Sequence, residues 1–182
     1  MLELLKKENF DEVFNIMQES FPEDERRSYD EQKKLLEKSY YNIYILKDDK
    51  DCSIKGFVAI YDFEKFVFLE HFAVSTSFRN QGLGAKILNE LLTAMQRLIC
   101  LEVELPNTEN AARRIGFYKR NGFFLNNGPY VQPALGKGKN PLPMKIMSSG
   151  RELSSSEFEF VKTTLYKKVY GYTEEKTFLD NK

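Results

Sequence analysis

The segment that most constrains this chain runs from residue 70 to residue 84. Its sequence is Glu-His-Phe-Ala-Val-Ser-Thr-Ser-Phe-Arg-Asn-Gln-Gly-Leu-Gly. An apolar run that is typical of a buried strand ends at Val74, a polar turn follows, and Gly82 and Gly84 precede a helix with one apolar face. This order presents free backbone N–H groups and the positive end of a helix dipole to an anion. Because a Cβ would block the close approach of a phosphate, the two glycines predict a site for a phosphorylated ligand.

The neighbouring residues exclude two common phosphate loops. The dinucleotide fingerprint needs a glycine three residues after Gly84, where Ile87 stands. The Walker loop needs a Lys-Ser or Lys-Thr pair after its second glycine, and this chain has none there. The pattern Arg-x-x-Gly-x-Gly, which begins at Arg79, instead resembles the pyrophosphate loop of the GNAT N-acetyltransferase superfamily, which holds acetyl-coenzyme A.

A second element strengthens this resemblance. Residues 114 to 123 read Arg-Ile-Gly-Phe-Tyr-Lys-Arg-Asn-Gly-Phe and are similar to the later helix of the superfamily, where a tyrosine precedes Gly-Phe by four residues. Together the two elements span about 66 to 126. The resemblance implies the GNAT fold, an α/β (α+β) arrangement with a mixed central sheet and flanking helices. In that fold, two parallel strands, here beginning near Phe66 and Leu98, splay apart at their ends.

Length and composition limit the alternatives. The chain has 182 residues and a formal net charge of zero, so we expect one domain without the electric field that attracts nucleic acid or an anionic membrane. Cys52 and Cys100 are too few for a disulfide framework and indicate reduced thiols in a cytoplasmic protein. No apolar window is long enough for a membrane span or a signal peptide, and one histidine makes a metal site unexpected.

We therefore expect a single N-acetyltransferase domain over residues 1–182, with 150–182 as a C-terminal helical extension. Whether the chain is a monomer or a homodimer stays open. The periodicity of apolar residues predicts helices over 8–20, 28–39, 83–97, 109–120 and 156–169, and strands over 1–5, 42–47, 54–61, 66–74, 98–105 and 142–148. The stretch after Phe123 is rich in glycine and proline and is expected to be mostly loop.

The resemblance implies that acetyl-CoA binds as a cosubstrate at the glycine loop. Backbone N–H groups from about Gln81 to Ala85 would face the pyrophosphate, Arg79 would add a charged contact, and the N–H of Val74 would polarise the thioester carbonyl. Asn110 would contact the pantetheine arm or cap its helix. The expected cofactor-binding set is Phe72, Val74, Arg79, Asn80, Gln81, Gly82, Leu83, Gly84, Ala85, Asn110 and Tyr118.

Transfer to an amine needs a base. A lysine-like amine has a pKa near 10.4, about three units above pH 7, so it is almost fully protonated at that pH. A carboxylate or histidine that can accept its proton should therefore lie within reach. Strand alternation predicts Glu70 on one face with Phe72 and Val74, and His71 on the other. In relatives that acetylate arylalkylamines or histones, the base lies on this strand and face. The resemblance thus implies Glu70 as the base; the alternative is a buried glutamate paired with a neighbouring arginine.

Two further residues complete the catalytic hypothesis. Leu101-Glu102-Val103 resembles the strand of protein N-terminal acetyltransferases whose glutamate is the base. Glu102 is therefore the second candidate, although it could also bind a cationic substrate or face water. Tyr118 matches the family tyrosine that protonates the departing thiolate; the alternative is a tyrosine packed in the core.

The predicted activity is transfer of an acetyl group from acetyl-CoA to a primary amine of a small molecule, by direct attack in a ternary complex. We expect residues 21–27 and 130–133 to line the site of the amine acceptor. Two alternatives stay open: a protein acetyltransferase acting on a lysine or an N-terminus, and a non-catalytic acyl-CoA-binding module.

Overall fold

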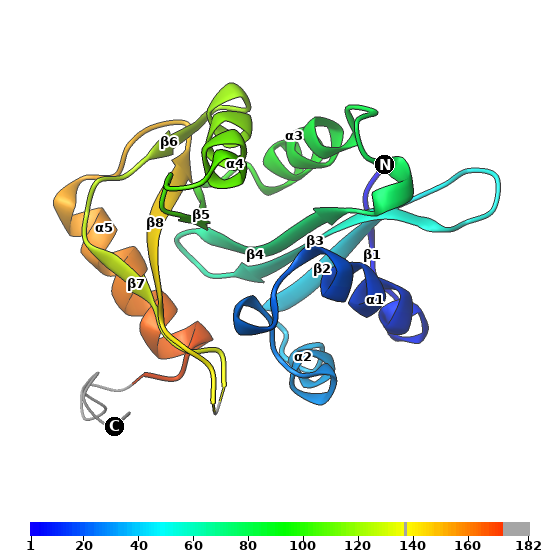
Figure 1. Ribbon diagram of the computed structural model, residues 1–182, viewed down its shortest axis with the longest axis horizontal. Helices are drawn as coiled ribbons and strands as arrows, with labels where there is room; N and C mark the ends of the chain where they lie inside the picture. The colour runs from blue at the N-terminus through cyan, green and yellow to red at the C-terminus, as the bar shows by residue number, and fades with distance from the viewer. Residues whose placement is uncertain (137, 173–182) are drawn as a thin grey trace.

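One mixed sheet of eight strands organises the computed structural model, which describes residues 1–136 and 138–172 (Figure 1). The strand order is β1-β2-β3-β4-β5-β8-β6, and β7 also pairs with β8. The strands are β1 (Glu3–Leu4), β2 (Tyr41–Lys47), β3 (Ile54–Asp62), β4 (Val67–Val74), β5 (Ile99–Glu104), β6 (Phe123–Leu125), β7 (Tyr130–Gln132) and β8 (Leu142–Ser149).

Five α-helices flank this sheet within the described residues. They are α1 (Phe10–Ser20), α2 (Tyr29–Leu35), α3 (Leu83–Met95), α4 (Glu109–Arg120) and α5 (Ser155–Thr164). Short 3-10 turns cover Lys7–Asn9, Glu23–Glu25 and Thr76–Phe78, and a π-helical turn covers Leu165–Val169 directly after α5. Ser154 forms a reciprocal capping box with Glu157, which fixes the start of α5 one residue before the predicted start at 156.

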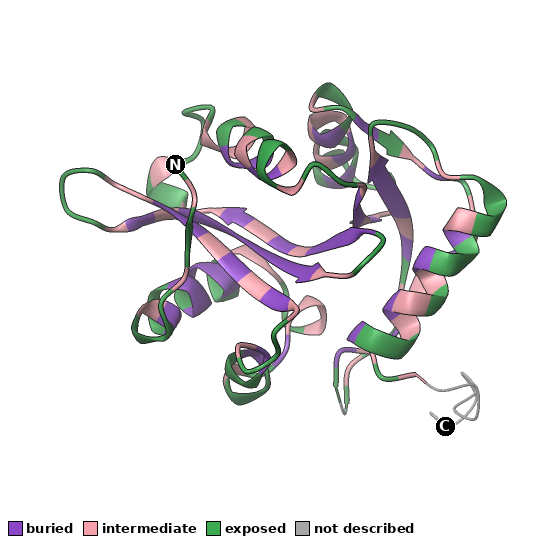
Figure 2. Ribbon diagram, turned by 180° about the vertical axis from the view of Figure 1, so that it is seen from behind, coloured by how far each residue is buried: buried purple, intermediate pink, exposed green. Residues whose placement is uncertain are grey.

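The helices cover both faces of the sheet. Helices α1, α2 and α5 bury residues such as Met17, Leu35 and Phe158 in a core on one face. Helices α3 and α4 bury Leu88 and Ile115 in a second core on the other face (Figure 1). The central strands between these two layers are almost entirely buried (Figure 2). The predicted fold class, a mixed α/β chain with helices on both sides of its sheet, is confirmed.

Strands β6 and β7 lie in the stretch that was expected to be loop. Each has only three residues, too few for an alternating pattern to be recognised in the sequence. Both form antiparallel pairs with β8: Phe123 lies opposite Ser149, and Tyr130 lies opposite Met144. Long-range pairing with β8 therefore creates them, and Tyr130 and Gln132 of β7 are buried.

Strands β4 and β5 diverge, as the resemblance stated above implies. They pair in parallel only where Val67–Leu69 of β4 meets Ile99–Leu101 of β5. Beyond these residues β4 continues to Val74 beside β3, whereas β5 continues to Glu104 beside β8. The carboxyl ends of the two strands thus enclose a gap in the middle of the sheet.

A β-bulge lies at the start of this gap. Ala59 of β3 pairs with His71 and Ile60 pairs with Leu69, so Glu70 has no opposite residue. The extra residue shifts the alternation of β4 at Glu70, so the prediction that Glu70 shares a face with Phe72 and Val74 is wrong. Phe72 lies on the α3–α4 side of the sheet. Glu70 and His71 both lie on the α1–α2 side, where their contacts are made.

No helix among the described residues is long and apolar enough to cross a bilayer. The expected extension over 150–182 contains α5 and the π-helical turn, and its residues 173–182 lie outside the described part of the chain.

Candidate active site

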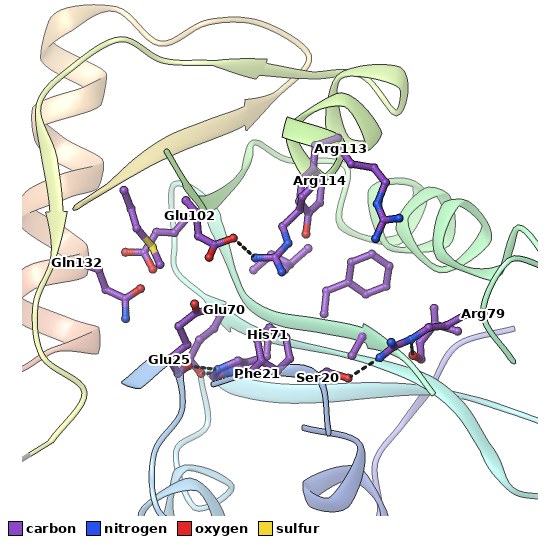
Figure 3. A pocket seen from close by; sticks show the side chains of 17 residues that line it. Ser20, Phe21, Glu25, Glu70, His71, Arg79, Glu102, Arg113, Arg114 and Gln132 are labelled. Atoms are coloured by element: carbon purple, nitrogen blue, oxygen red, sulfur yellow. Dashed lines mark hydrogen bonds and ion pairs between the residues drawn. The ribbon is translucent and has the colours of Figure 1, made fainter. Parts of the chain in front are cut away.

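Two cavities meet at the gap between β4 and β5. The larger, about 850 Å³, lies between the glycine loop and α4. The smaller, about 320 Å³, lies on the other side of the gap, where Glu25, Glu70, Glu102 and Gln132 reach it from four different elements (Figure 3). Six residues line both cavities: Phe72, Val74, Arg79, Arg113, Arg114 and Tyr118. A molecule bound in one cavity can therefore reach a molecule bound in the other.

The glycine loop forms one end of the larger cavity. Gly82 has a φ of +74°, and a Cβ added there would find no atom within 4 Å, so the space beside it is open. Asn80, Gly82 and residues 83–85 line the cavity, whereas Gln81 lies outside its wall. Helix α3 begins at Leu83 and directs its free N–H groups toward this space. This geometry suits an anion, and the anion site itself stays a prediction.

Arg79 and Asn110 also border the larger cavity. The Arg79 Nε donates to the Val74 carbonyl at 3.1 Å, and its Nη2 donates to the Ser20 hydroxyl at 3.3 Å, which holds the guanidinium at the junction of the two cavities. Thr108 caps α4 by accepting the N–H of Ala111 at 3.1 Å. The capping role considered for Asn110 is therefore wrong, and its contact with the pantetheine arm stays a prediction.

Tyr118 lies between the two cavities. Its ring packs edge-on against Phe117 and Phe123, with centroid distances of 5.3 and 5.6 Å. Burial raises the pKa of Tyr118 to about 12, so the phenol keeps its proton at neutral pH. The residue can therefore donate a hydrogen bond to an atom in the gap.

Glu70 forms a buried ion pair with Arg27, and their side chains are 4% and 10% exposed. Burial, the largest single effect, would raise the pKa of Glu70, but the Arg27 charge, the neighbouring His71 and the hydrogen bond from Arg27 together lower it to about 2. His71 donates from Nε2 to the Glu25 carbonyl at 2.9 Å, and its Nδ1 lies 3.4 Å from the Glu70 carboxylate. These contacts match the alternative interpretation of Glu70, a buried glutamate paired with an arginine.

Glu102 is surrounded by tyrosines instead of cations. Tyr130 donates a hydrogen bond to its Oε1, and the Tyr170 hydroxyl lies 2.9 Å from Oε1 and 2.7 Å from Oε2. Burial raises the pKa of Glu102 to about 7, while the two hydroxyl groups act in the opposite direction. Neither tyrosine was predicted to contact Glu102, because no local motif links them to a strand 28 and 68 residues away.

The two segments predicted to line the acceptor site form opposite walls of the smaller cavity. Phe21 and Glu25 lie on one wall and Gln132 on the other. Burial, and then the nearby Glu104 carboxylate, raise the pKa of Glu25. Glu104 itself pairs with Arg114 at 3.0 Å.

Residues of the loop between β7 and β8 contact the segment before α2. Lys139 Nζ donates to the Glu23 carbonyl at 2.9 Å and also to the Arg26 carbonyl. Asn140 Nδ2 donates to the Asp24 carboxylate at 3.3 Å. These contacts bridge the loop that follows Gln132 and the segment that contains Glu25.

Metal ligands do not gather anywhere in residues 1–136 and 138–172: no three His, Cys, Asp or Glu side chains come together there. The polar groups that line the smaller cavity include carboxylates, guanidinium groups, a phenol and the His71 imidazole.

Comparison with known proteins agrees with this geometry. The sequence model of the Acetyltransferase (GNAT) family matches residues 10–123. A solved GNAT-family protein from Bacteroides thetaiotaomicron is 32% identical, with a TM-score of 0.87 over 95% of this chain and 99% of that one. YjbC of Bacillus subtilis (strain 168) is 28% identical over 169 residues, which cover 91% of this chain and 84% of YjbC.

More distant neighbours show the fold alone. The ribosomal-protein-S18-alanine N-acetyltransferase from Escherichia coli is 19% identical, with a TM-score of 0.61 over 85% of this chain and 96% of that one. That enzyme acts on a ribosomal protein, and the likeness at 19% identity is one of fold.

The buried ion pair gives a prediction about stability. We expect Glu70→Gln to lower the free energy of unfolding at pH 7 by about 3 to 5 kcal/mol, because it leaves the Arg27 guanidinium buried without a counter-charge. The pKa of Glu70 in the folded chain, about 2, lies below its ordinary value of 4.5. The contribution of the pair is therefore complete above about pH 4.5 and is lost as the pH falls toward 2. Denaturant unfolding at a series of pH values should show wild type and variant converging over that range.

Asp62→Asn is the matched control. It breaks the pair between Asp62 and Arg97, whose side chains are 36% and 37% exposed, and should cost less than about 1 kcal/mol. A loss for Glu70→Gln that is no larger than this, or that stays constant down to pH 2.5, would contradict the prediction.

Proposed function

Because the chain belongs to the GNAT acetyltransferase family, it is an acyltransferase, and we propose that it moves an acetyl group from acetyl-CoA to a primary amine of a small molecule. The observation that carries this proposal is the meeting of two cavities at the gap between β4 and β5, with Glu102 in one and Tyr118 bordering both. We propose direct attack by the amine in a ternary complex.

The larger cavity fits acetyl-CoA, which supplies an activated thioester when bound. Open space beside Gly82, the start of α3 and the Arg79 guanidinium suit a pyrophosphate. Beyond Leu69, the backbone of β4 on the gap side has no strand partner, which suits an extended pantetheine arm. We propose that the Val74 N–H polarises the acetyl carbonyl.

We propose Glu102 as the base in place of Glu70. An ammonium group has a pKa near 10.4, so transferring its proton to a carboxylate of pKa about 2 costs about 11 kcal/mol. Transfer to Glu102, with a pKa of about 7, costs about 5 kcal/mol. The bond to Arg27 also occupies one oxygen of Glu70. Glu102 therefore takes the proton from the amine, directly or through water.

Tyr118 is the proposed acid. Its phenol donates a hydrogen bond to the departing sulfur and can pass on its proton as the C–S bond breaks. A thiol has a pKa near 8.5, so complete transfer from a phenol of pKa about 12 is uphill by about 5 kcal/mol. Stabilisation of the developing thiolate by the hydrogen bond is thus the larger part of this role.

The bridge between the loop that follows Gln132 and the segment that contains Glu25 favours a small acceptor over a peptide. An extended peptide adds about 3.3 Å per residue and needs a groove that is open at both ends. We propose that the contacts of Lys139 and Asn140 with the segment before α2 close one such exit, and a volume of about 320 Å³ suits a small amine. A protein acetyltransferase is the weaker alternative, since it would need this bridge to open.

Binding of acetyl-CoA is the first test. We expect calorimetric titration to give a dissociation constant in the micromolar range, and we expect Gly82→Trp to abolish the binding because the indole would fill the open space at the loop. Gly150→Trp is the matched control: Gly150 has a similar φ of +78° and equally open surroundings, but it follows β8. Equal loss of affinity in both variants would contradict the location of the site.

The second prediction concerns the base. With an amine substrate, kcat/KM should fall below about pH 7 as Glu102 becomes protonated. Glu102→Gln should lower kcat/KM by about 10²-fold or more and remove this acidic limb. Glu104→Gln, a change on the same face of β5, should keep the limb. An unchanged pH profile in Glu102→Gln would exclude Glu102 as the base.

The third prediction concerns acceptor size. We expect the wild-type chain to acetylate small primary amines with a higher kcat/KM than a lysine-containing peptide. Lys139→Ala should reduce the difference in kcat/KM between the two kinds of acceptor, because it removes the contacts of Lys139 with the segment before α2. Lys145→Ala should leave the difference unchanged, because Lys145 of β8 bonds to the Asn127 carbonyl instead. A wild-type preference for the peptide would favour the protein acetyltransferase alternative.

A further inference from the structure

The C-terminal segment reaches into the candidate active site. Tyr170 directly follows the π-helical turn Leu165–Val169, and its hydroxyl lies within hydrogen-bond distance of both oxygens of Glu102. Tyr130 of β7 also donates a hydrogen bond to the Glu102 Oε1. Both tyrosines lie beyond the segment that the GNAT family model matches, residues 10–123.

The backbone around Tyr170 is fixed in place. The wide π-turn is closed by the Tyr170 N–H, which donates to the Leu165 carbonyl at 3.1 Å, and Leu165 and Val169 are buried in the core. The Val169 carbonyl accepts a hydrogen bond from Arg27 Nη2 at 3.3 Å. The guanidinium that pairs with Glu70 therefore also holds the residue before Tyr170.

We propose that Tyr170, together with Tyr130, is a positioning residue that orients the Glu102 carboxylate and keeps it available as a proton acceptor. The role follows from geometry: two phenol groups donate to one partly buried carboxylate that lines the acceptor cavity. This inference rests on the proposed function, in which Glu102 is the base. It extends the catalytic unit to the C-terminal segment.

The two hydroxyl groups oppose the effect of burial. Burial favours the neutral form of Glu102, and each hydrogen bond donated to the carboxylate favours the charged form. Burial also raises the pKa of both tyrosines well above their ordinary value, so they remain protonated donors at neutral pH.

Other charges around Glu102 partly cancel. On β4, the Glu70 carboxylate raises the pKa of Glu102 and His71 lowers it. Arg27 balances the charge of Glu70 from the segment before α2. On β5, the strand that carries Glu102, Glu104 is paired with Arg114 of α4. The tyrosine hydroxyls are therefore the direct contacts whose removal should change the titration of Glu102.

The experiment follows the ionisation of Glu102 in the full-length chain and needs no substrate. The side-chain carboxyl carbons of glutamate are labelled with ¹³C, and the Glu102 signal is assigned by its loss in Glu102→Gln. We expect Tyr170→Phe to move the titration midpoint of Glu102 upward by about one pH unit. Tyr130→Phe should move it in the same direction.

Tyr166→Phe is the matched control on the same segment. Its hydroxyl donates to the Val131 carbonyl at 2.8 Å, so the variant removes a C-terminal hydroxyl without removing a bond to Glu102. We expect its Glu102 midpoint to match wild type. A midpoint in Tyr170→Phe within about 0.3 units of wild type, in a chain whose melting shows that it is folded, would overturn the proposal.

Turnover measurements separate this inference from the proposed function. If amines are acetylated, the acidic limb of kcat/KM should move upward in Tyr170→Phe by the same amount as the titration midpoint; a uniform loss of rate at every pH would instead indicate a purely structural role and overturn the proposal. If no amine is acetylated, the proposed function fails. The role of Tyr170 in catalysis then fails with it, whereas an upward midpoint would still establish the tyrosine as a determinant of the Glu102 charge.

Discussion

The divergence of β4 and β5 is the constraint on which the rest of the structure depends. Only three residue pairs join the strands, and past Leu69 and Leu101 the facing backbone groups have no strand partner. Such groups must bond to another partner or to water, which makes the gap a suitable place for an extended ligand. Because parallel strands end at the same edge, the gap also receives the glycine loop that follows β4 and the helix α4 that follows β5.

Two carboxylates stand at the opening of this gap, and their surroundings differ in kind. Glu70 meets the charge of Arg27, which holds its proton affinity low, whereas Glu102 meets neutral phenols that oppose only part of the effect of burial. The partners of these two glutamates, which lie on diverging strands, thus shift their pKa values in different ways. This contrast favours a structural role for Glu70 and a proton-accepting role for Glu102.

Much of this architecture could be predicted from the sequence. The strand, glycine loop and helix at residues 70–84 appear as expected, because their signals are local: an apolar run, two glycines and an apolar helix face. The side chain of Glu70 could not be placed. Alternation assumes uninterrupted pairing, and the bulge arises from the register between β3 and β4, which single-strand patterns do not contain.

The partners of the two carboxylates could not be predicted from the sequence, for a related reason. Arg27 is separated from Glu70 by 43 positions, and Tyr170 from Glu102 by 68. Neither distance leaves a periodic or motif-like trace in the chain. The sequence could thus identify Glu70, Glu102 and Tyr118 as residues of interest, while the contacts that decide between roles depend on tertiary packing.

The contributions of Glu70 and Glu102 to the stability of the fold change in opposite directions as the pH rises. In the folded chain Glu102 binds its proton more tightly than its ordinary pKa of 4.5 implies, so its contribution to stability decreases as the pH rises from about 4.5 to 7. Glu70 binds its proton less tightly, so its contribution increases as the pH rises from about 2 to 4.5. Together they favour the fold most near pH 4.5, where Glu102 holds its proton. Glu102 must be charged to act as a base, and the charged form is the one that burial destabilises. The Glu70–Arg27 pair is intact at the pH where Glu102 is charged, and its contribution offsets that loss of stability.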